Sequence, residues 1–359
     1  MDNTTQVGDI VIVSGSYGAG HDAAADALAL TLRTGGYTVR QLDVAELLPW
    51  RVGVVLRWLY FAQLRWLPGS WGSTLRVLEG DGVVFRSVRR ILGLLGWRLV
   101  ADVRGAHLVI VTHPFAAQAL GEARSREALD ARVVTYLTDA SAHRLWVHAS
   151  VDLHLAIHEV AARQARELGG EARVIAAVVP RRPGAAAGWT PPWNAERPVA
   201  LVVGGSCGVG DLEGSALDIL ATGLMTPAVV CGSNERLRQR LEALPGIVAL
   251  GWRDDMVELI GAASCVVQNA GGMTSLESLA AGTPTLTYRP IAGHGMTNAT
   301  ALAAAGLISW PIDPVELDGA LLRVLVSPGS FSLPQGAPSV LAVLEDSGLV
   351  AVRAPLVAA

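Results

Sequence analysis

The chain has 359 residues, of which 51% are hydrophobic and 17% are charged, and its formal net charge is −4. This length predicts two domains, and the hydrophobic fraction is sufficient for two cores. The net negative charge argues against a nucleic-acid-binding protein. All 28 basic residues are Arg, which excludes a phosphate-loop Lys or a Lys Schiff base.

The three cysteines, Cys207, Cys231 and Cys265, are widely spaced and form no Cys-x-x-Cys motif. They predict neither a disulfide framework nor a zinc site, and they fit a reducing cytoplasm. The first residues lack the basic and apolar pattern of a secretory signal, and no segment has the length and apolarity of a membrane span. We therefore expect a cytoplasmic protein.

The first strand is predicted at residues 10–13 and leads through the Gly-rich sequence SGSYGAGH into an Ala-rich helix. Strand, Gly-rich loop and helix in this order are typical of phosphate-binding α/β proteins. The glycine spacing differs from the dinucleotide-binding motif, so a nicotinamide cofactor is not expected. His21, at the end of the loop, fits either a helix cap or a catalytic group in a cleft.

Residues 49–100 are unusually rich in tryptophan and arginine, with five of the ten tryptophans of the chain. Eight arginines lie there against two acidic residues, Glu79 and Asp81. Aromatic and aliphatic residues alternate with Arg at helical spacing. This predicts a surface in a membrane interface, with Arg on anionic phosphates. The alternative is a pair of helices packed on the sheet, with a solvated Arg face.

Buried strands are predicted at residues 107–112 and 133–138, and Asp139 directly follows the second. The carboxyl end of a parallel strand points toward the ligand-binding side of an open α/β sheet. A carboxylate there can take the proton of a hydroxyl nucleophile or orient that hydroxyl, whereas the alternative is a helix N-cap. His143 and Trp146 share a face if this loop coils. No carboxylate stands at metal-ligand spacing from three further histidines, which we interpret as structural: His148, His154 and His158.

The Pro- and Gly-rich residues 183–198 predict a linker to a second α/β half. A strand at residues 199–203 leads into a second Gly-rich loop, Gly204–Gly210, which is again a phosphate cradle by its geometry. A third such connection follows the strand at residues 266–268, where a Gly-Gly turn precedes a predicted helix. Free backbone N–H groups at this helix start suit a diphosphate, and Glu277 suits ribose hydroxyls. An ordinary strand–turn–helix connection is the alternative.

Several motifs together resemble one glycosyltransferase family, that of plant monogalactosyldiacylglycerol synthases and bacterial processive diacylglycerol glucosyltransferases. The GlcNAc transferase of the peptidoglycan lipid intermediate is a more distant relative. The first half matches this family at His21 and at Thr138, Asp139, His143, Trp146, Val151 and Asp152. The second half matches it at Cys231, Gly232, Asn234, Leu237, Gly251, Trp252, Met256, Gly271, Gly272, Thr274, Glu277, Gly282, Pro284, Pro290, Gly293 and Asn298.

Two positions depart from the family pattern. Ala270 stands where the family has Pro before the Gly-Gly turn, and His294–Gly295 replaces a Gln/Glu pair. In the family this second loop faces the hydroxyls of the donor sugar, so the identity of the sugar stays open.

The resemblance implies the α/β GT-B glycosyltransferase architecture, with two Rossmann-like domains facing across a cleft. The expected parts are an acceptor-binding domain (1–182, with the apolar and basic insertion 46–105), the linker (183–198), a nucleotide-sugar-binding domain (199–328) and a tail with a crossing helix (329–359).

The implied function is an inverting transfer of a hexose from a nucleotide sugar, expected to be UDP-linked, to a hydroxyl of a lipid acceptor such as diacylglycerol. No cofactor or metal is expected, and the enzyme is expected at the inner face of the plasma membrane. The alternatives are a glycosyltransferase for a soluble natural product and a non-catalytic nucleotide-sugar binder.

The resemblance assigns site residues in three groups. The expected catalytic residues are Asp139 and His21, either of which is a candidate base. The expected acceptor-binding residues are Gly18, Gly20, His143 and Trp146. The expected donor-binding residues are Gly205, Ser206, Gly232, Trp252, Met256, Gly271, Gly272, Met273, Thr274, Glu277 and Asn298.

Overall fold

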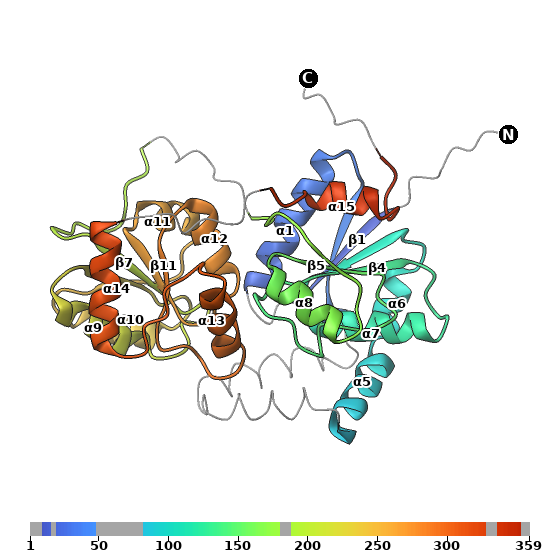
Figure 1. Cartoon of the computed structure of the whole chain (residues 1–359), viewed down its shortest axis with the longest axis horizontal. Coiled ribbons are helices and arrows are strands. Elements are labelled where there is room, and N and C mark those ends of the chain that lie inside the picture. Colours follow the sequence, from blue (N-terminus) through green and yellow to red (C-terminus); the bar gives the residue numbers. More distant parts are fainter. Residues whose placement is uncertain (1–8, 16–18, 48–81, 180–187, 328–335, 353–359) are drawn as a thin grey trace. The chain divides into compact units, whose positions relative to one another are not determined.

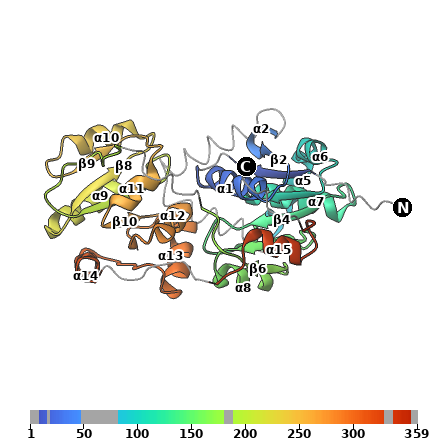
Figure 2. The ribbon, with the colours of Figure 1, turned by 90° about the horizontal axis from the view of Figure 1, so that it is seen from above.

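The computed structural model describes residues 9–15, 19–47, 82–179, 188–327 and 336–352. It divides into two compact units, each with its own parallel sheet and with helices packed around it (Figures 1 and 2). Of the described residues, the first unit holds those up to 178 and those from 336 onward, and the second holds the remainder. Two parallel α/β units agree with the predicted fold class.

The sheet of the first unit has six strands in the order β2-β1-β3-β4-β5-β6, and every pair is parallel. The strands are β1 (Ile10–Ser14), β2 (Val39–Asp43), β3 (Leu108–Val111), β4 (Arg132–Tyr136), β5 (Leu153–Ala156) and β6 (Ala172–Val174). The strand order reverses its direction between β1 and β3. Ligands of open α/β sheets bind outside the carboxyl ends of the strands at such a reversal.

The helices of the first unit connect these strands and cover the sheet. They are α1 (Ala19–Thr34), α2 (Val44–Leu47), α5 (Val83–Leu95), α6 (Trp97–Val103), α7 (Pro114–Ser125), α8 (Glu159–Glu167) and α15 (Val340–Asp346). Alternate side chains of β1, Val11 and Val13, pack into a hydrophobic core together with residues of α6 and α7. The inner strands β1 and β3 are buried on both faces, which explains their continuous apolar sequences, whereas the edge strand β2 exposes Arg40 and Gln41.

The C-terminal helix α15 is packed into the first unit, although the second unit precedes it in the sequence. Ser339 caps it by accepting a hydrogen bond from the Ala342 N–H. The Tyr37 hydroxyl donates to the Ala351 carbonyl at 2.6 Å, and the Ala176 N–H donates to the Pro338 carbonyl at 2.8 Å. The tail therefore completes the first unit.

The second unit has a five-stranded parallel sheet in the order β11-β10-β7-β8-β9, which reverses between β7 and β10. Its strands are β7 (Val199–Val203), β8 (Thr226–Val230), β9 (Val248–Leu250), β10 (Cys265–Gln268) and β11 (Thr285–Thr287). Its helices are α9 (Leu212–Thr222), α10 (Glu235–Glu242), α11 (Met256–Ala262), α12 (Met273–Ala281), α13 (His294–Ala304) and α14 (Pro314–Val326).

Two predicted segments lie only partly within the described residues. Residues 188–198 of the predicted linker lie against the second unit, where Trp189, Trp193 and Ala195 pack on its core and the Trp189 indole donates to Asp255 at 2.8 Å. Within the predicted insertion, residues 48–81 lie outside the described residues, and residues 83–103 form α5 and α6. No helix in the described part of the chain has the length and apolar character to cross a bilayer.

The carboxylate of Asp152 joins β4, β5 and α7. It accepts hydrogen bonds from the Val133 N–H at 2.8 Å, from Arg132 at 2.8 Å and from Arg124 at 3.1 Å. Its side chain is 11% exposed, so the two guanidinium groups and the amide replace most of its water. Asp152 matches the family pattern but lies away from the site described below, and these contacts give it a structural role.

We expect Asp152→Ala to lower the free energy of unfolding by about 2–3 kcal/mol, because it leaves the largely buried Val133 amide without its acceptor and removes the carboxylate partner of Arg124, which keeps only backbone carbonyls. Urea unfolding measures this loss. Asp346→Ala is the matched control, since it removes an exposed ion pair with Arg173 and should cost less than about 1 kcal/mol. Equal losses in the two variants would contradict this role for Asp152.

Candidate active site

The carboxyl ends of three neighbouring strands in the first unit gather most of its predicted site residues. His21 lies in the first turn of α1 after β1, Thr112 and His113 follow β3, and Asp139 follows β4. Because β1, β3 and β4 are adjacent and β1/β3 is the reversal point, these side chains share one edge of the sheet.

A backbone carbonyl fixes the tautomer of His21. Its Nδ1 lies 2.7 Å from the Thr112 carbonyl oxygen, and the Thr112 hydroxyl donates in return to the His21 carbonyl at 3.0 Å. A carbonyl oxygen can only accept, so Nδ1 carries the hydrogen and Nε2 of the neutral ring keeps its lone pair. The Thr138 hydroxyl lies 3.3 Å from the same Nδ1.

Burial keeps His21 neutral. The pKa of His21 is lowered from 6.5, mainly by desolvation, while the carboxylate of Asp139, the Thr112 carbonyl and Asp22 act to raise this pKa. At neutral pH the imidazole is therefore uncharged, and its basic Nε2 can take a proton. After it takes one, the nearby Asp139 carboxylate stabilises the imidazolium.

Trp146 holds Asp139. The indole N–H donates to Asp139 Oδ2 at 3.2 Å, and the ring has no exposed surface. The predicted face shared by His143 and Trp146 exists in part, since their rings lie 6.3 Å apart, but His143 is the partly exposed member. The buried Trp146 ring orients the Asp139 carboxylate, and its assignment to acceptor binding stays a prediction.

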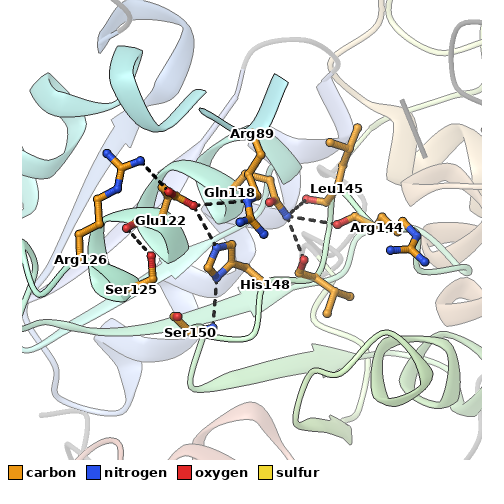
Figure 3. Close-up of polar contacts among 10 residues, drawn as sticks. Arg89, Gln118, Glu122, Ser125, Arg126, Arg144, Leu145, His148 and Ser150 are labelled. Atoms are coloured by element: carbon orange, nitrogen blue, oxygen red, sulfur yellow. Dashed lines mark hydrogen bonds and ion pairs between the residues drawn. The ribbon is translucent and has the colours of Figure 1, made fainter. Parts of the chain in front are cut away.

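The buried side chain of Gln118, on α7, supports the turn that carries Trp146. The Gln118 amide group donates to the carbonyls of Arg144, Leu145 and Val147 at 3.2, 3.0 and 3.0 Å. Figure 3 shows this side chain pointing from its helix into the turn. Gln118 is fully buried, so no water competes for these carbonyls.

One turn farther along α7, Glu122 anchors three basic groups (Figure 3). Its carboxylate lies 3.4 Å from Arg89 of α5, 2.7 Å from Arg126 and 3.7 Å from His148. His148 also accepts from the Ser150 N–H, and His154 bonds the Glu171 carbonyl. These contacts give both histidines structural partners.

His113 is a site residue that the sequence reasoning missed. Its ring lies 4.9 Å from the His21 ring, and its Nδ1 accepts the Phe115 N–H at 3.3 Å, which caps α7. Burial, followed by His21 and His143, holds the pKa of His113 well below 6.5, so the ring is neutral. Gly15 permits this contact, because a Cβ there would lie 2.7 Å from His113 Cγ.

In the second unit the predicted donor residues follow the carboxyl ends of all five strands, and most of them follow β7 and β10, on the two sides of the reversal point. The loop after β7 is braced by the loop after β8, since the Ser233 N–H donates to the Ser206 carbonyl at 2.9 Å. Gly232 has a φ of 55°, and a Cβ there would lie 2.2 Å from that carbonyl oxygen. Gly205 also has a positive φ, of 70°, and faces open space.

The Gly-Gly turn leads into α12 as predicted. Gly271 has a φ of 72°, and its missing side chain makes room for Asn298, whose amide donates to the Ala270 carbonyl at 3.1 Å. No side chain caps the start of α12 at Gly272, so the N–H groups of Met273 and Thr274 are available to an anion.

Glu277 lies in the second turn of α12 and is partly buried. Among the described residues its carboxylate has no hydrogen bond or ion pair, and burial raises the pKa of Glu277 to about 7. A desolvated carboxylate of this kind is suited to accepting hydrogen bonds from a ligand.

Trp252 and Met256 follow β9 at the edge of the same sheet. Trp252 is 56% exposed, with its indole donating to Asp254 at 2.8 Å, and Met256 packs partly on the core. Trp252 thus presents an aromatic surface to solvent beside the strand ends.

Comparison with known proteins shows which class of enzyme this chain resembles. Residues 21–177 match the family model of monogalactosyldiacylglycerol (MGDG) synthase. A processive diacylglycerol beta-glucosyltransferase from Bacillus cytotoxicus is 25% identical over 262 residues, which cover 66% of this chain and 67% of the relative. A protein of the same name from Bacillus thuringiensis is 25% identical over 313 residues, covering 81% of this chain and 78% of the relative.

Solved structures of glycosyltransferases share the fold over nearly the whole chain. The glycosyltransferase SnogD from Streptomyces nogalater superposes with a TM-score of 0.61 at 17% identity, covering 96% of this chain and all of SnogD. MurG from Acinetobacter baumannii superposes with a TM-score of 0.52 at 16% identity, covering 95% and 99%. The chain is a glycosyltransferase. Its GT-B fold and its homology to diacylglycerol glycosyltransferases confirm the predicted resemblance.

The predicted site residues of the glycosyltransferase fall into two sets, one in each unit. His21, Gly20, Asp139, His143 and Trp146 lie at one sheet edge of the first unit, and Gly18 lies outside the described residues. The donor set lies along the strand ends of the second unit. The signal for His113 was present in the sequence as a His-Pro pair directly after an apolar strand, where Pro begins a helix.

The raised pKa of Glu277 predicts a pH-dependent stability. Its folded pKa of about 7 exceeds the reference value of 4.5, so ionisation of Glu277 destabilises the fold, and this cost declines as pH falls from 7 and vanishes below 4.5. We expect Glu277→Gln to stabilise the glycosyltransferase by up to about 3 kcal/mol at pH 8.5 and by much less at pH 5.5. Urea unfolding without ligand at both pH values measures this difference. An equal effect at both would contradict a neutral, desolvated Glu277.

Proposed function

We propose that this glycosyltransferase moves a hexose, with inversion, from a UDP-linked sugar to a hydroxyl of a lipid acceptor such as diacylglycerol at an anionic membrane surface. The observation that carries the chemistry is the neutral His21, whose Nδ1–H is bound to the Thr112 carbonyl while Asp139 lies nearby. The homology to diacylglycerol glycosyltransferases supports the lipid acceptor.

In the proposed reaction His21 is the base and Asp139 its electrostatic partner. The acceptor oxygen attacks the anomeric carbon as its proton passes to His21 Nε2, and the bond from that carbon to the nucleotide diphosphate breaks. His21 is neutral in the resting enzyme and becomes cationic when it takes this proton. The Trp146 indole keeps the Asp139 carboxylate in place for this charge.

The proposed donor contacts use the backbone. The start of α12 and the Gly-rich loop after β7 offer N–H groups to the diphosphate, whose charge develops as it leaves. Glu277 accepts hydrogen bonds from the ribose. We propose that these groups stabilise the leaving diphosphate without a required metal.

The membrane contact is proposed for the exposed face of α5 and the start of α6. Ile91 is 53% exposed, Leu94 66% and Trp97 55%, and the neighbouring Arg86 and Arg90 are also exposed. Apolar and basic side chains on one helix face are typical of interfacial helices. The other face of α5 packs on α7, so this contact would not disturb the core.

The chemistry is tested by the pH dependence of kcat/KM. Because the pKa of His21 lies below 6.5, activity should rise with pH along an acidic limb below 6.5 and stay level at neutral pH. Asp139→Asn removes a charge that raises the pKa of His21, so it should shift this limb to lower pH and reduce turnover by roughly 10²–10⁴-fold. His21→Ala should reduce turnover on the same scale, with donor binding retained.

The double variant distinguishes a base with its partner from two independent groups. Residues that act as a unit are not additive, so the double variant should be little worse than the worse single one. Near-normal turnover of His21→Ala would refute His21 as the base. A normal acidic limb in Asp139→Asn would refute the electrostatic partnership.

The membrane contact is tested by sedimentation with vesicles. Arg86→Gln with Arg90→Gln should weaken binding to anionic vesicles by about 2 kcal/mol, near 1 kcal/mol for each Arg, and the loss should fade at high salt. Arg163→Gln with Arg236→Gln, at two exposed sites elsewhere, is the charge-matched control. If the wild-type enzyme does not bind anionic vesicles at low salt, a soluble acceptor becomes the better proposal.

A further inference from the structure

Three loops in the second unit, those after β7, β10 and β11, are tied together by hydrogen bonds. The Asn269 amide donates to the Val209 carbonyl at 2.8 Å, and the Ile291 N–H donates to the Asn269 carbonyl at 2.9 Å. The loops after β7 and β10 carry the predicted donor residues Gly205, Ser206, Gly271 and Gly272, and the loop after β11 lies beside them at the same sheet edge and leads to Asn298 in α13.

Arg289 connects this third loop to α9. It follows β11 with a φ of 48°, a left-handed conformation that is uncommon for a residue with a side chain. Its Nε and Nη2 contact Asp218 at 3.1 and 2.6 Å, and its Nη1 contacts Asp211. The Tyr288 hydroxyl donates to the same Asp218 oxygen at 2.8 Å.

These contacts differ from an ordinary surface ion pair. One guanidinium bridges two carboxylates, and Asp211 also caps α9 by accepting the Gly214 N–H at 2.9 Å. A Cβ at Gly214 would lie 2.8 Å from Arg289 Nη1, so a glycine is needed for this approach. Left-handed residues that persist at ligand sites are held by their surroundings, as Arg289 is here.

We propose that Arg289 is a positioning residue for the donor, which fixes the loop 288–293 against the start of α9. This inference rests on the proposed function, since it names a support for the nucleotide-sugar site. Arg289 acts through the loop that bonds Asn269, and it has no role in the acceptor site of the first unit. Loosening it therefore weakens the donor complex and leaves acceptor binding unchanged.

The test compares matched variants in donor binding and kinetics. Arg289→Gln should weaken UDP-glucose or UDP-galactose binding by roughly tenfold and leave the acceptor KM within about twofold. Asp211→Asn keeps the helix cap but removes the charge, so it should have a similar effect, and the double variant should be no worse than Arg289→Gln alone. Arg289→Lys should restore part of the affinity, because it keeps the charge but cannot bridge two carboxylates.

The control is Arg240→Gln, which breaks an exposed ion pair between α10 and Glu213 of the same α9. If Arg289→Gln behaves like this control, or raises the KM of donor and acceptor equally, the positioning role is overturned. Arg289→Gly relieves the left-handed backbone while removing the side chain, so it should fold and still bind donor weakly. Normal donor affinity in this variant would also overturn the role. A wild-type enzyme that binds neither UDP-sugar would instead refute the proposed function.

Discussion

The hydrogen bond from His21 Nδ1 to the Thr112 carbonyl is the contact on which the site of the first unit depends. It joins the first turn of α1 to the end of β3 at the point where the sheet reverses its order. It also determines which ring nitrogen is basic, because the other nitrogen is committed to the backbone. The same contact thus links the fold to the proposed proton transfer. The Thr112 hydroxyl adds a second hydrogen bond, which it donates to the His21 carbonyl.

Much of this arrangement could be predicted from the sequence, because parallel sheets place ligand groups at the carboxyl ends of their strands. This rule places Asp139 and His21 at the edge of the first sheet, and the loop 204–210 and the Gly-Gly turn at the edge of the second, as the structure has them. The roles of Trp146 and His113 could not be found, since they depend on which way a side chain points once helices pack on the sheet. The linker 183–198 was predicted from its Pro and Gly content, but its tryptophans pack on the second unit instead.

The departure of the loop after β11 from the family pattern has a steric cause. Gly295 is buried at the start of α13, and a Cβ there would lie 2.7 Å from both the Asn269 carbonyl and Ile291 Cγ1. The side chain usual in the family has no room while Ile291 and Asn269 keep these positions. Under the proposed function, the donor sugar therefore meets no side chain at Gly295, and the adjacent side chain of this loop is His294.

The two units solve the same electrostatic problem in opposite ways. In the first unit burial lowers the pKa of His21, and Asp139 opposes this shift, so the imidazole is neutral while the nearby carboxylate stabilises its cation. In the second unit burial raises the pKa of Glu277 to about 7, and no charged partner opposes the shift among the described residues. The first arrangement suits a group that changes its charge during turnover. The second suits a group whose missing partner is supplied by a ligand, because the hydrogen bonds that the ligand brings offset the cost of burial.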